Sequence, residues 1–199
     1  MSSQTDICNM AATLIGVGRI TAITDNSKTA RSMSAVYDMV RLGELRKHFW
    51  SFASARALLP ALATPPAWQF GNACQLPADF VRLIQVNDFY ADPAMMDYRN
   101  QDDSAYTIEN DQIFTDFQVP LKIRYIQDVT DTGRFDPLFC LAVAAQLAWY
   151  TCEELTNSDA KRQTCLKAYE QAIQDAMRAN AFEKAPEGVA DDSWMLIRL

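Results

Sequence analysis

The stretch FDPLFCLAVAAQLAWY, residues 135–150, constrains the fold of this chain more than any other feature. From Leu138 to Thr151 its one strongly polar residue is Gln146, and Glu153 follows soon after. A helix that crosses a bilayer needs about 20 apolar residues, so this run is too short to be one. A helix that is apolar on nearly every face must be covered by other parts of the protein. We therefore predict that it forms the central helix of a bundle.

The residues that flank this run predict a helical hairpin. Asp136 followed by Pro137 is a good helix start, because the carboxylate caps free N–H groups and proline has no N–H to leave unpaired. The helix should run to about Leu155, and Ser158 should cap a last helix over residues 159–182. The connection is short, so the two helices should be antiparallel neighbours. The last helix has an apolar row formed by Leu166, Tyr169, Ile173 and Met177.

Two further helices are expected in the first 50 residues. Apolar residues at helical spacing predict a short amphipathic helix over residues 7–15, stopped by Gly16 and Gly18. A longer helix is expected over residues 27–48. Two apolar rows predict that it is covered on more than one side. The first row is Met33, Val36, Tyr37 and Val40, and the second is Met39, Leu42, Leu45 and Phe49.

After Trp50 the pattern changes to short apolar runs punctuated by proline and glycine. FVRLIQV (80–86) and LKIRYI (121–126) alternate with period two, which predicts strands. AYTIE and QIFT predict a hairpin, because Asn110 and Asp111 between them tolerate the positive φ of a tight turn. We expect a small β-region inserted between helices.

Together these elements predict a mainly α protein of the α+β class: an antiparallel helical bundle with a small inserted β-region and an extended C-terminal tail. The bundle would be discontinuous in sequence, formed by residues 1–53 and 128–185, with residues 54–127 as the β-rich insertion. Residues 186–199 would form a docking tail, because an apolar tip follows its acidic start. The tip consists of Trp194, Met195, Leu196, Ile197 and Arg198.

Composition and charge limit the class of protein. A chain of 199 residues fits one ordinary domain or a core domain with an insertion. The net charge of −7, from 18 basic and 25 acidic residues, argues against a surface that grips nucleic acid. The first residues show no signal-peptide pattern, so we expect a soluble protein made in the cytoplasm. Five widely spread cysteines without a C-x-x-C pair predict reduced, mostly buried thiols and no zinc site.

A search for catalytic, cofactor and metal motifs predicts no enzyme and no cofactor. GVG at 16–18 lacks the third glycine of a dinucleotide-binding loop, and DVTDTG at 128–133 lacks the ligands of a calcium loop. His48 has no identifiable Ser or Cys partner. Glu153 and Glu154 point in different directions on their helix, so they do not form a catalytic carboxylate pair. The closest thing to a basic cluster in the sequence consists of Arg41, Arg46, Lys47 and His48. We expect these side chains to interact favourably with the dipole at the C-terminal end of their helix.

Four segments, taken in order, resemble those of one family. They are WSFASARALL, LPADFVRLIQV, LKIRYIQDVTDTGRFDPLFCLAVAAQLAWYTCEELTNS and, near the end, SWMLIR. The chain is similar to the head-to-tail adaptors of short-tailed bacteriophages, often called tail tubular protein A. In that family a W-x-F-A stretch, an L-P-x-D-x-x-R strand, a D-P-x-F helix and a tail with Ser-Trp follow an early helical pair. The resemblance covers nearly the whole chain, but residues 91–117 carry little of it and the early helices match only in pattern.

The resemblance implies a structural virion protein that is made in the host cytoplasm and located at the head-tail junction. About twelve copies would form a ring beneath the portal protein, and the lower side of the ring would seat a tail nozzle like tail tubular protein B. Genomic DNA would pass through the centre without specific binding, and no membrane contact is expected. By analogy with tails that embrace the portal, Trp194 to Arg198 would dock there. The alternative for this tip is packing back on its own bundle.

Two other functions remain open at this point. A head-completion connector of a long-tailed phage, prophage or gene-transfer particle uses a similar helical core. A nozzle gene next door would favour the short tail, whereas a tape-measure gene would favour the long one. A virion-associated cell-wall hydrolase is the second alternative, and it would clear a suspension of purified cell wall. No residue pair in the sequence suggests itself for that chemistry.

Overall fold

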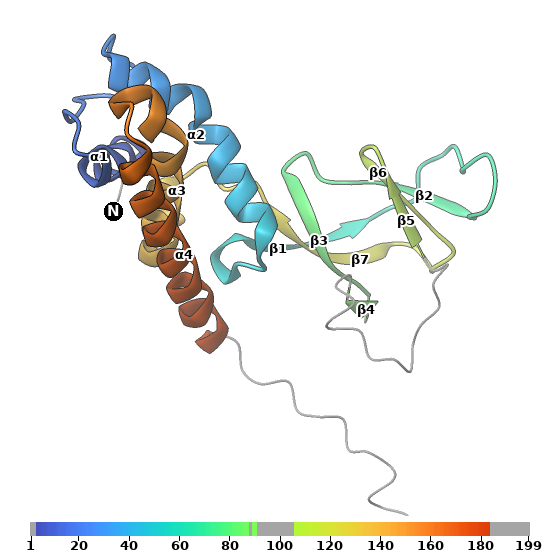
Figure 1. The fold of residues 1–199 in the computed structure, drawn as a ribbon. Coiled ribbons are helices and arrows are strands. Elements are labelled where there is room, and N and C mark those ends of the chain that lie inside the picture. Colours follow the sequence, from blue (N-terminus) through green and yellow to red (C-terminus); the bar gives the residue numbers. More distant parts are fainter. Residues whose placement is uncertain (1–2, 88, 91–105, 184–199) are drawn as a thin grey trace, which may run out of the picture.

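The computed structural model describes residues 3–87, 89–90 and 106–183. A helical part and a sheet part lie side by side (Figure 1). The helices of the helical part are α1 (Gln4–Ile15), α2 (Lys28–Lys47), α3 (Pro137–Thr156) and α4 (Asp159–Phe182). Short 3-10 helices stand where the chain leaves and re-enters this part, η1 (Ser51–Ala53) and η4 (Thr132–Arg134).

The strands of the described residues form two antiparallel sheets. A four-stranded sheet has the order β1-β7-β3-β4, with β1 (Ser54–Leu59), β3 (Phe80–Val86), β4 (Phe89–Tyr90) and β7 (Leu121–Gln127). A three-stranded sheet has the order β2-β6-β5, with β2 (Asn72–Gln75), β5 (Tyr106–Glu109) and β6 (Gln112–Thr115). Three predicted features are confirmed: the strand at 80–86, the strand expected at 121–126, which extends to Gln127, and a hairpin turn whose Asn110 has φ 54°.

The expectation of a helical bundle with a small β-insertion is wrong. The protein has an α+β fold in which the two sheets are a substantial part with its own hydrophobic core, formed around Leu83, Val86, Ile113 and Leu121. The strands that were not predicted explain the error. β1 has the sequence SARALL, and Ala, Arg and Leu favour helices in isolation. It is a strand because it pairs with β7 over its whole length.

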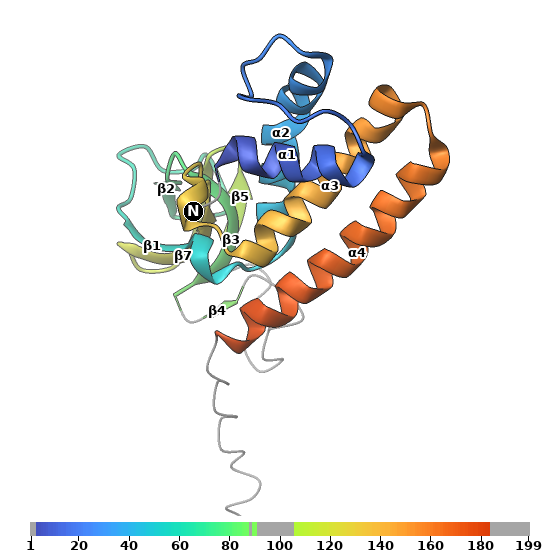
Figure 2. The same ribbon diagram turned by 90° about the vertical axis from the view of Figure 1, so that its left-hand side faces the viewer.

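Helix α3 lies at the centre of the helical part, as predicted from its sequence. It contacts α1, α2 and α4, and most of its residues are buried (Figure 2). Asp136 caps its start: Leu138 N and Phe139 N donate to Oδ1 over 2.8 and 3.3 Å. Asn157, at φ 49°, ends the helix, and Ser158 caps α4. The predicted α3–α4 hairpin is confirmed, and α3 is the element around which the other helices pack.

One predicted apolar row is shifted, and another is covered only in part. In α4 the buried residues are Cys165, Ala176 and Asn180, whereas Met177, from the predicted row, is 39% exposed. In α2 the second row is only partly covered, because Met39 is 61% exposed. The buried face of α4 is therefore formed by smaller side chains beside the predicted row, whose Ile173 packs against the core from a half-buried position.

Candidate functional site

Four aromatic rings pack together where the chain passes between the helical and sheet parts, and we call them the junction cluster: Trp50, Phe52, Phe135 and Phe139. Phe139 is the common neighbour, with ring centroids 5.0 Å from those of Trp50 and Phe52 and 5.2 Å from that of Phe135. All three of these contacts are edge-to-face, a favourable arrangement for aromatic quadrupoles. The cluster joins η1 to the start of α3, so residues about 85 positions apart in sequence form one packing unit.

Asn180 holds the η1 segment against α4. Its Oδ1 accepts from Ser51 N over 2.7 Å, and its Nδ2 donates to Phe49 O over 3.0 Å. Trp50 is fixed from the other side, because its Nε1 donates to Glu44 O over 2.8 Å. Asn180 is only 7% exposed, so both backbone groups are paired away from water. Sequence reasoning missed this residue, because its partners lie about 130 positions away.

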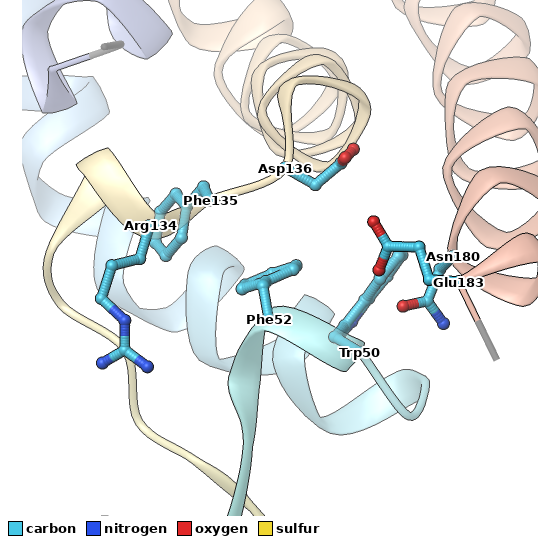
Figure 3. Close-up of a pocket in the computed structure, with 7 residues that line it drawn as sticks. All are labelled: Trp50, Phe52, Arg134, Phe135, Asp136, Asn180 and Glu183. Atoms are coloured by element: carbon cyan, nitrogen blue, oxygen red, sulfur yellow. The ribbon is translucent and has the colours of Figure 1, made fainter.

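A pocket of about 190 Å³ opens beside the junction cluster (Figure 3). Its lining comes from η1, the η4–α3 connection and the end of α4, and consists of Trp50, Phe52, Arg134, Phe135, Asp136, Asn180 and Glu183. The carboxylates of Asp136 and Glu183 point toward the same space above the Trp50 ring, whereas the guanidinium of Arg134 points away from them (Figure 3). The pocket thus combines aromatic walls with negative charge. We call it the junction pocket.

The basic residues near the end of α2 attach the sheet part to the helical part. Arg82 Nη1 donates to Arg46 O and Lys47 O, and its guanidinium lies 4.5 Å from the Phe49 ring centroid. Arg46 Nη1 donates in turn to Val81 O over 2.5 Å. Arg46 and Lys47 lie in the last turn of α2, as expected, and Arg82 from β3 adds hydrogen bonds to two carbonyl groups at this helix end.

Arg41 was expected in the same basic cluster, and its role is different. It is 3% exposed and forms an ion pair with Asp128, just after β7. Its Nη1 also donates to Val129 O over 2.8 Å. A buried guanidinium needs such partners, because an unpaired buried charge is strongly destabilising. Arg41 therefore fixes the point where the chain leaves the sheet.

A polar cluster lies between α2 and α4. Glu44 is fully buried, and its Oε1 accepts from Lys47 Nζ over 2.5 Å and from Tyr169 OH over 3.0 Å. Burial opposes the charge on Lys47, but its hydrogen bonds to Glu44 and Tyr169 prevail and raise the pKa of its ammonium group. Burial, together with the charge of Glu44, raises the pKa of Tyr169. These hydrogen bonds hold α4 against α2 through Glu44 Oε1, whereas the other carboxylate oxygen, Oε2, is buried without a hydrogen-bond partner.

The LPADF segment is joined to β7 by a second polar contact. Tyr125 OH donates to Asp79 Oδ1 over 2.9 Å, and Asp128 N donates to Asp79 O over 2.7 Å. Burial and this hydrogen bond raise the pKa of Tyr125 to about 12. Asp79 therefore ties the turn before β3 to the end of β7, which gives the aspartate of this motif a structural role.

All five cysteines are free and buried, as predicted. Burial raises the pKa of Cys8 to about 12. Burial, together with the neighbouring Cys152, raises that of Cys165 to about 11. The thiolate is the reactive form of cysteine, so these two side chains are poor nucleophiles at neutral pH.

We expect the free energy of unfolding to fall as pH rises from about 9 to about 12. Cys8, Cys165 and Tyr125 have folded-state pKa values above their ordinary ones, so the unfolded chain loses these protons first. The stabilisation that these three groups contribute is fully present below their ordinary pKa values. It is lost as the pH rises through their folded-state pKa values, by at most about 1.4 kcal/mol per pH unit for each group. Urea titrations at pH 8, 9, 10 and 11 measure the slope. Cys8→Ala should reduce it; an unchanged slope would contradict the assignment.

The predicted site residues are only partly placed. Trp194, Met195, Leu196, Ile197 and Arg198 lie outside the described residues. His48 caps the end of α2, and its ring packs edge-on against Trp50 with centroids 5.1 Å apart. The adjacent glutamates at the end of α3 have separate partners: Arg162 Nη1 donates to Glu153 Oε2 over 2.8 Å, and Ser32 Oγ donates to Glu154 Oε1 over 2.5 Å.

Within the described ranges, no group of three or more His, Cys, Asp or Glu side chains is arranged to hold a metal ion. Each helix in the same ranges is too short or too polar to span a membrane. Comparison of the chain with models of known protein families and with curated protein sequences gives no match.

Proposed function

We propose that this protein is the head-to-tail adaptor of a short-tailed bacteriophage. Copies of it would form a ring beneath the portal protein, with the tail nozzle seated on the opposite side. Genomic DNA would pass through the centre of the ring. The protein would thus act by assembly in the virion, without catalysis.

One observation carries the proposal: three of the four sequence segments that resemble the adaptor family pack against one another, and the fourth, SWMLIR, lies outside the described residues. WSFASARALL contains η1 and β1, LPADFVRLIQV contains β3, and the long third segment contains β7 and α3. β7 lies between β1 and β3 in the sheet, and the junction cluster joins the first segment to α3. Chance matches scattered along a chain have no reason to form one contiguous unit.

Charge and exposed strand edges agree with this role. The net charge of −7 suits a conduit that DNA must traverse without being held, because phosphate contacts require clustered basic residues. Among the described strands, β1 and β5 are edge strands of different sheets, and each carries an exposed apolar side chain, Leu58 at 64% and Ile108 at 38%. A ring needs two different surfaces that meet between neighbours.

The test is the mass of the purified protein, alone and mixed with portal rings from the same genome. We expect a monomer that joins a ring-sized complex only when the portal is present, as measured by light scattering or native mass spectrometry. Deletion of residues 186–199 should abolish the complex while the helical content remains. A protein that stays monomeric with the portal would contradict the proposal.

A further inference from the structure

The strands of the four-stranded sheet carry positive charge and no negative charge. They contain no aspartate or glutamate, and their basic residues are Arg56, Arg82, Lys122 and Arg124. In the pairing of β1 with β7, Arg56 lies directly opposite Arg124, and Leu58 lies opposite Lys122. Cross-strand partners share a face of the sheet, and so do residues two positions apart, so these four side chains lie on one face. Like charges directly opposite each other destabilise a sheet, so the fold itself gives no reason for this arrangement.

Three of these cations lack a partner within the part of the chain that the structure describes. The side chains of Arg56, Lys122 and Arg124 form no hydrogen bond or ion pair with another described residue. Arg56 and Lys122 are exposed and Arg124 is half-buried, while Leu58 beside them is 64% exposed. We call these four residues the basic sheet face. It offers positive charge and an apolar contact to a negatively charged partner.

The three-stranded sheet has the opposite charge. Its strands and the β5–β6 turn contain Glu109 and Asp111 and no basic residue. Both acidic side chains are exposed, and Ile108 next to them is 38% exposed. This sheet lies at the end of the sheet part away from the helices (Figure 1). We call residues 108–111 the acidic hairpin tip.

We propose that the basic sheet face of one copy binds the acidic hairpin tip of a second copy. The two surfaces have complementary charges, and each includes an exposed apolar side chain, Leu58 on one and Ile108 on the other. Every copy carries both surfaces, so the contact is head-to-tail and can close into a ring. This inference rests on the proposed function and supplies the two different surfaces that a ring needs. In the ring the neighbouring hairpin would neutralise the unpaired cations, so they would not hold DNA.

The contact is weak between free subunits. Exposed ion pairs each contribute little and are screened by salt. Dilute protein at physiological salt is therefore monomeric. The contact becomes effective when a portal ring holds the subunits side by side, because their effective concentration then rises.

The experiment places a photo-cross-linker in the full-length protein, as Leu58→p-benzoylphenylalanine. An equimolar mixture of ¹⁵N-labelled and unlabelled chains is irradiated at high protein concentration and low salt, without any portal. Mass spectrometry should find links between chains from position 58 to residues 106–116. The matched control carries the cross-linker at Met39, which is 61% exposed on α2 and should not link to this hairpin.

Charge exchange tests the pairing of the two surfaces. Arg56→Glu together with Lys122→Glu in the cross-linker chain should lower the yield of these links about fivefold. Glu109→Arg in the added partner chain should restore the yield. Arg31→Glu together with Lys167→Glu makes the same change in net charge at exposed helix positions and should leave the yield unchanged. Circular dichroism at 222 nm checks that each variant is folded.

Three results would overturn the proposal: links only within one chain, links to other surfaces, or a yield that the double substitution on the basic sheet face leaves unchanged. Binding of a labelled DNA duplex to this face, in place of links between copies, would also overturn it. The portal is absent from the experiment, so its outcome does not depend on portal binding. The failure of either idea is therefore recognised separately.

Discussion

Replacing Ala145 with glutamate should leave the protein unfolded. Ala145 is 2% exposed on the central helix α3, so a longer, charged side chain would have no space, solvent or partner there. Overpacking costs about 1–3 kcal/mol, and a buried unpaired charge costs several more. A domain is stable by only about 5–15 kcal/mol, so the sum removes most or all of the stability. Circular dichroism at 222 nm and size-exclusion chromatography would report the loss.

The matched control is Leu141→Glu, one turn earlier on the same helix. Leu141 is 41% exposed, so a glutamate there reaches water and should shift the midpoint of thermal unfolding only slightly. A folded Ala145→Glu protein that fails only in assembly would show that this face of α3 is an interface between molecules and not part of the core.

Trp50→Ala should lower the free energy of unfolding by about 3–5 kcal/mol, the range for removing a large aromatic side chain from a core. The ring is 1% exposed and contacts Phe52 and Phe139, and its Nε1 donates to Glu44 O. The substitution leaves that buried carbonyl without its donor, which adds to the cavity. Urea unfolding at pH 7 gives the value.

Trp68→Ala is the matched control, because it removes a tryptophan that is not part of the core. Trp68 is 78% exposed, so its removal should change the free energy of unfolding by no more than about 0.5 kcal/mol. Equal effects for the two substitutions would mean that Trp50 contributes no more to the core than an exposed tryptophan does.

The helices could be predicted closely because their ends have local signals. α2 (Lys28–Lys47) lies within the expected range 27–48 and α4 (Asp159–Phe182) matches its own, since Ser27 and Ser158 accept hydrogen bonds from the first turns that follow them. Capping depends on residues three positions apart, so a single sequence contains the information. The start of α3 at Asp136 was predicted for the same reason.

The extent of the sheets could not be predicted in the same way. β1 and β2 are strands because of distant partners, Ser54 opposite Ile126 and Asn72 opposite Thr115. Alternation in SARALL and NACQ is too weak to indicate a strand without those partners. The prediction therefore placed the helices correctly but underestimated the number of strands and the size of the sheet part.

The candidate site was predictable only as separate pieces. The motifs containing Trp50 and Phe135 stood out in the sequence, but nothing there indicated that their rings meet. The hydrogen bonds of Asn180 to the η1 segment could not be predicted, because an asparagine on a polar helix face is expected to be solvent-exposed. The junction pocket needs all three segments at once, so no single stretch of sequence contains its signal.

Two polar attachments of the sheet part end on the same helix, and this affects how the molecule would carry force. Arg82 and Arg46 bind reciprocally between β3 and the last turn of α2, and Arg41, less than two turns earlier, binds Asp128 beyond β7. A pull or twist on the sheets would therefore reach α2 first and α3 through it. If the protein were compressed between two larger partners, α2 would transmit the load between the sheets and the other helices. A tilt of α2 would then tilt the sheets with it.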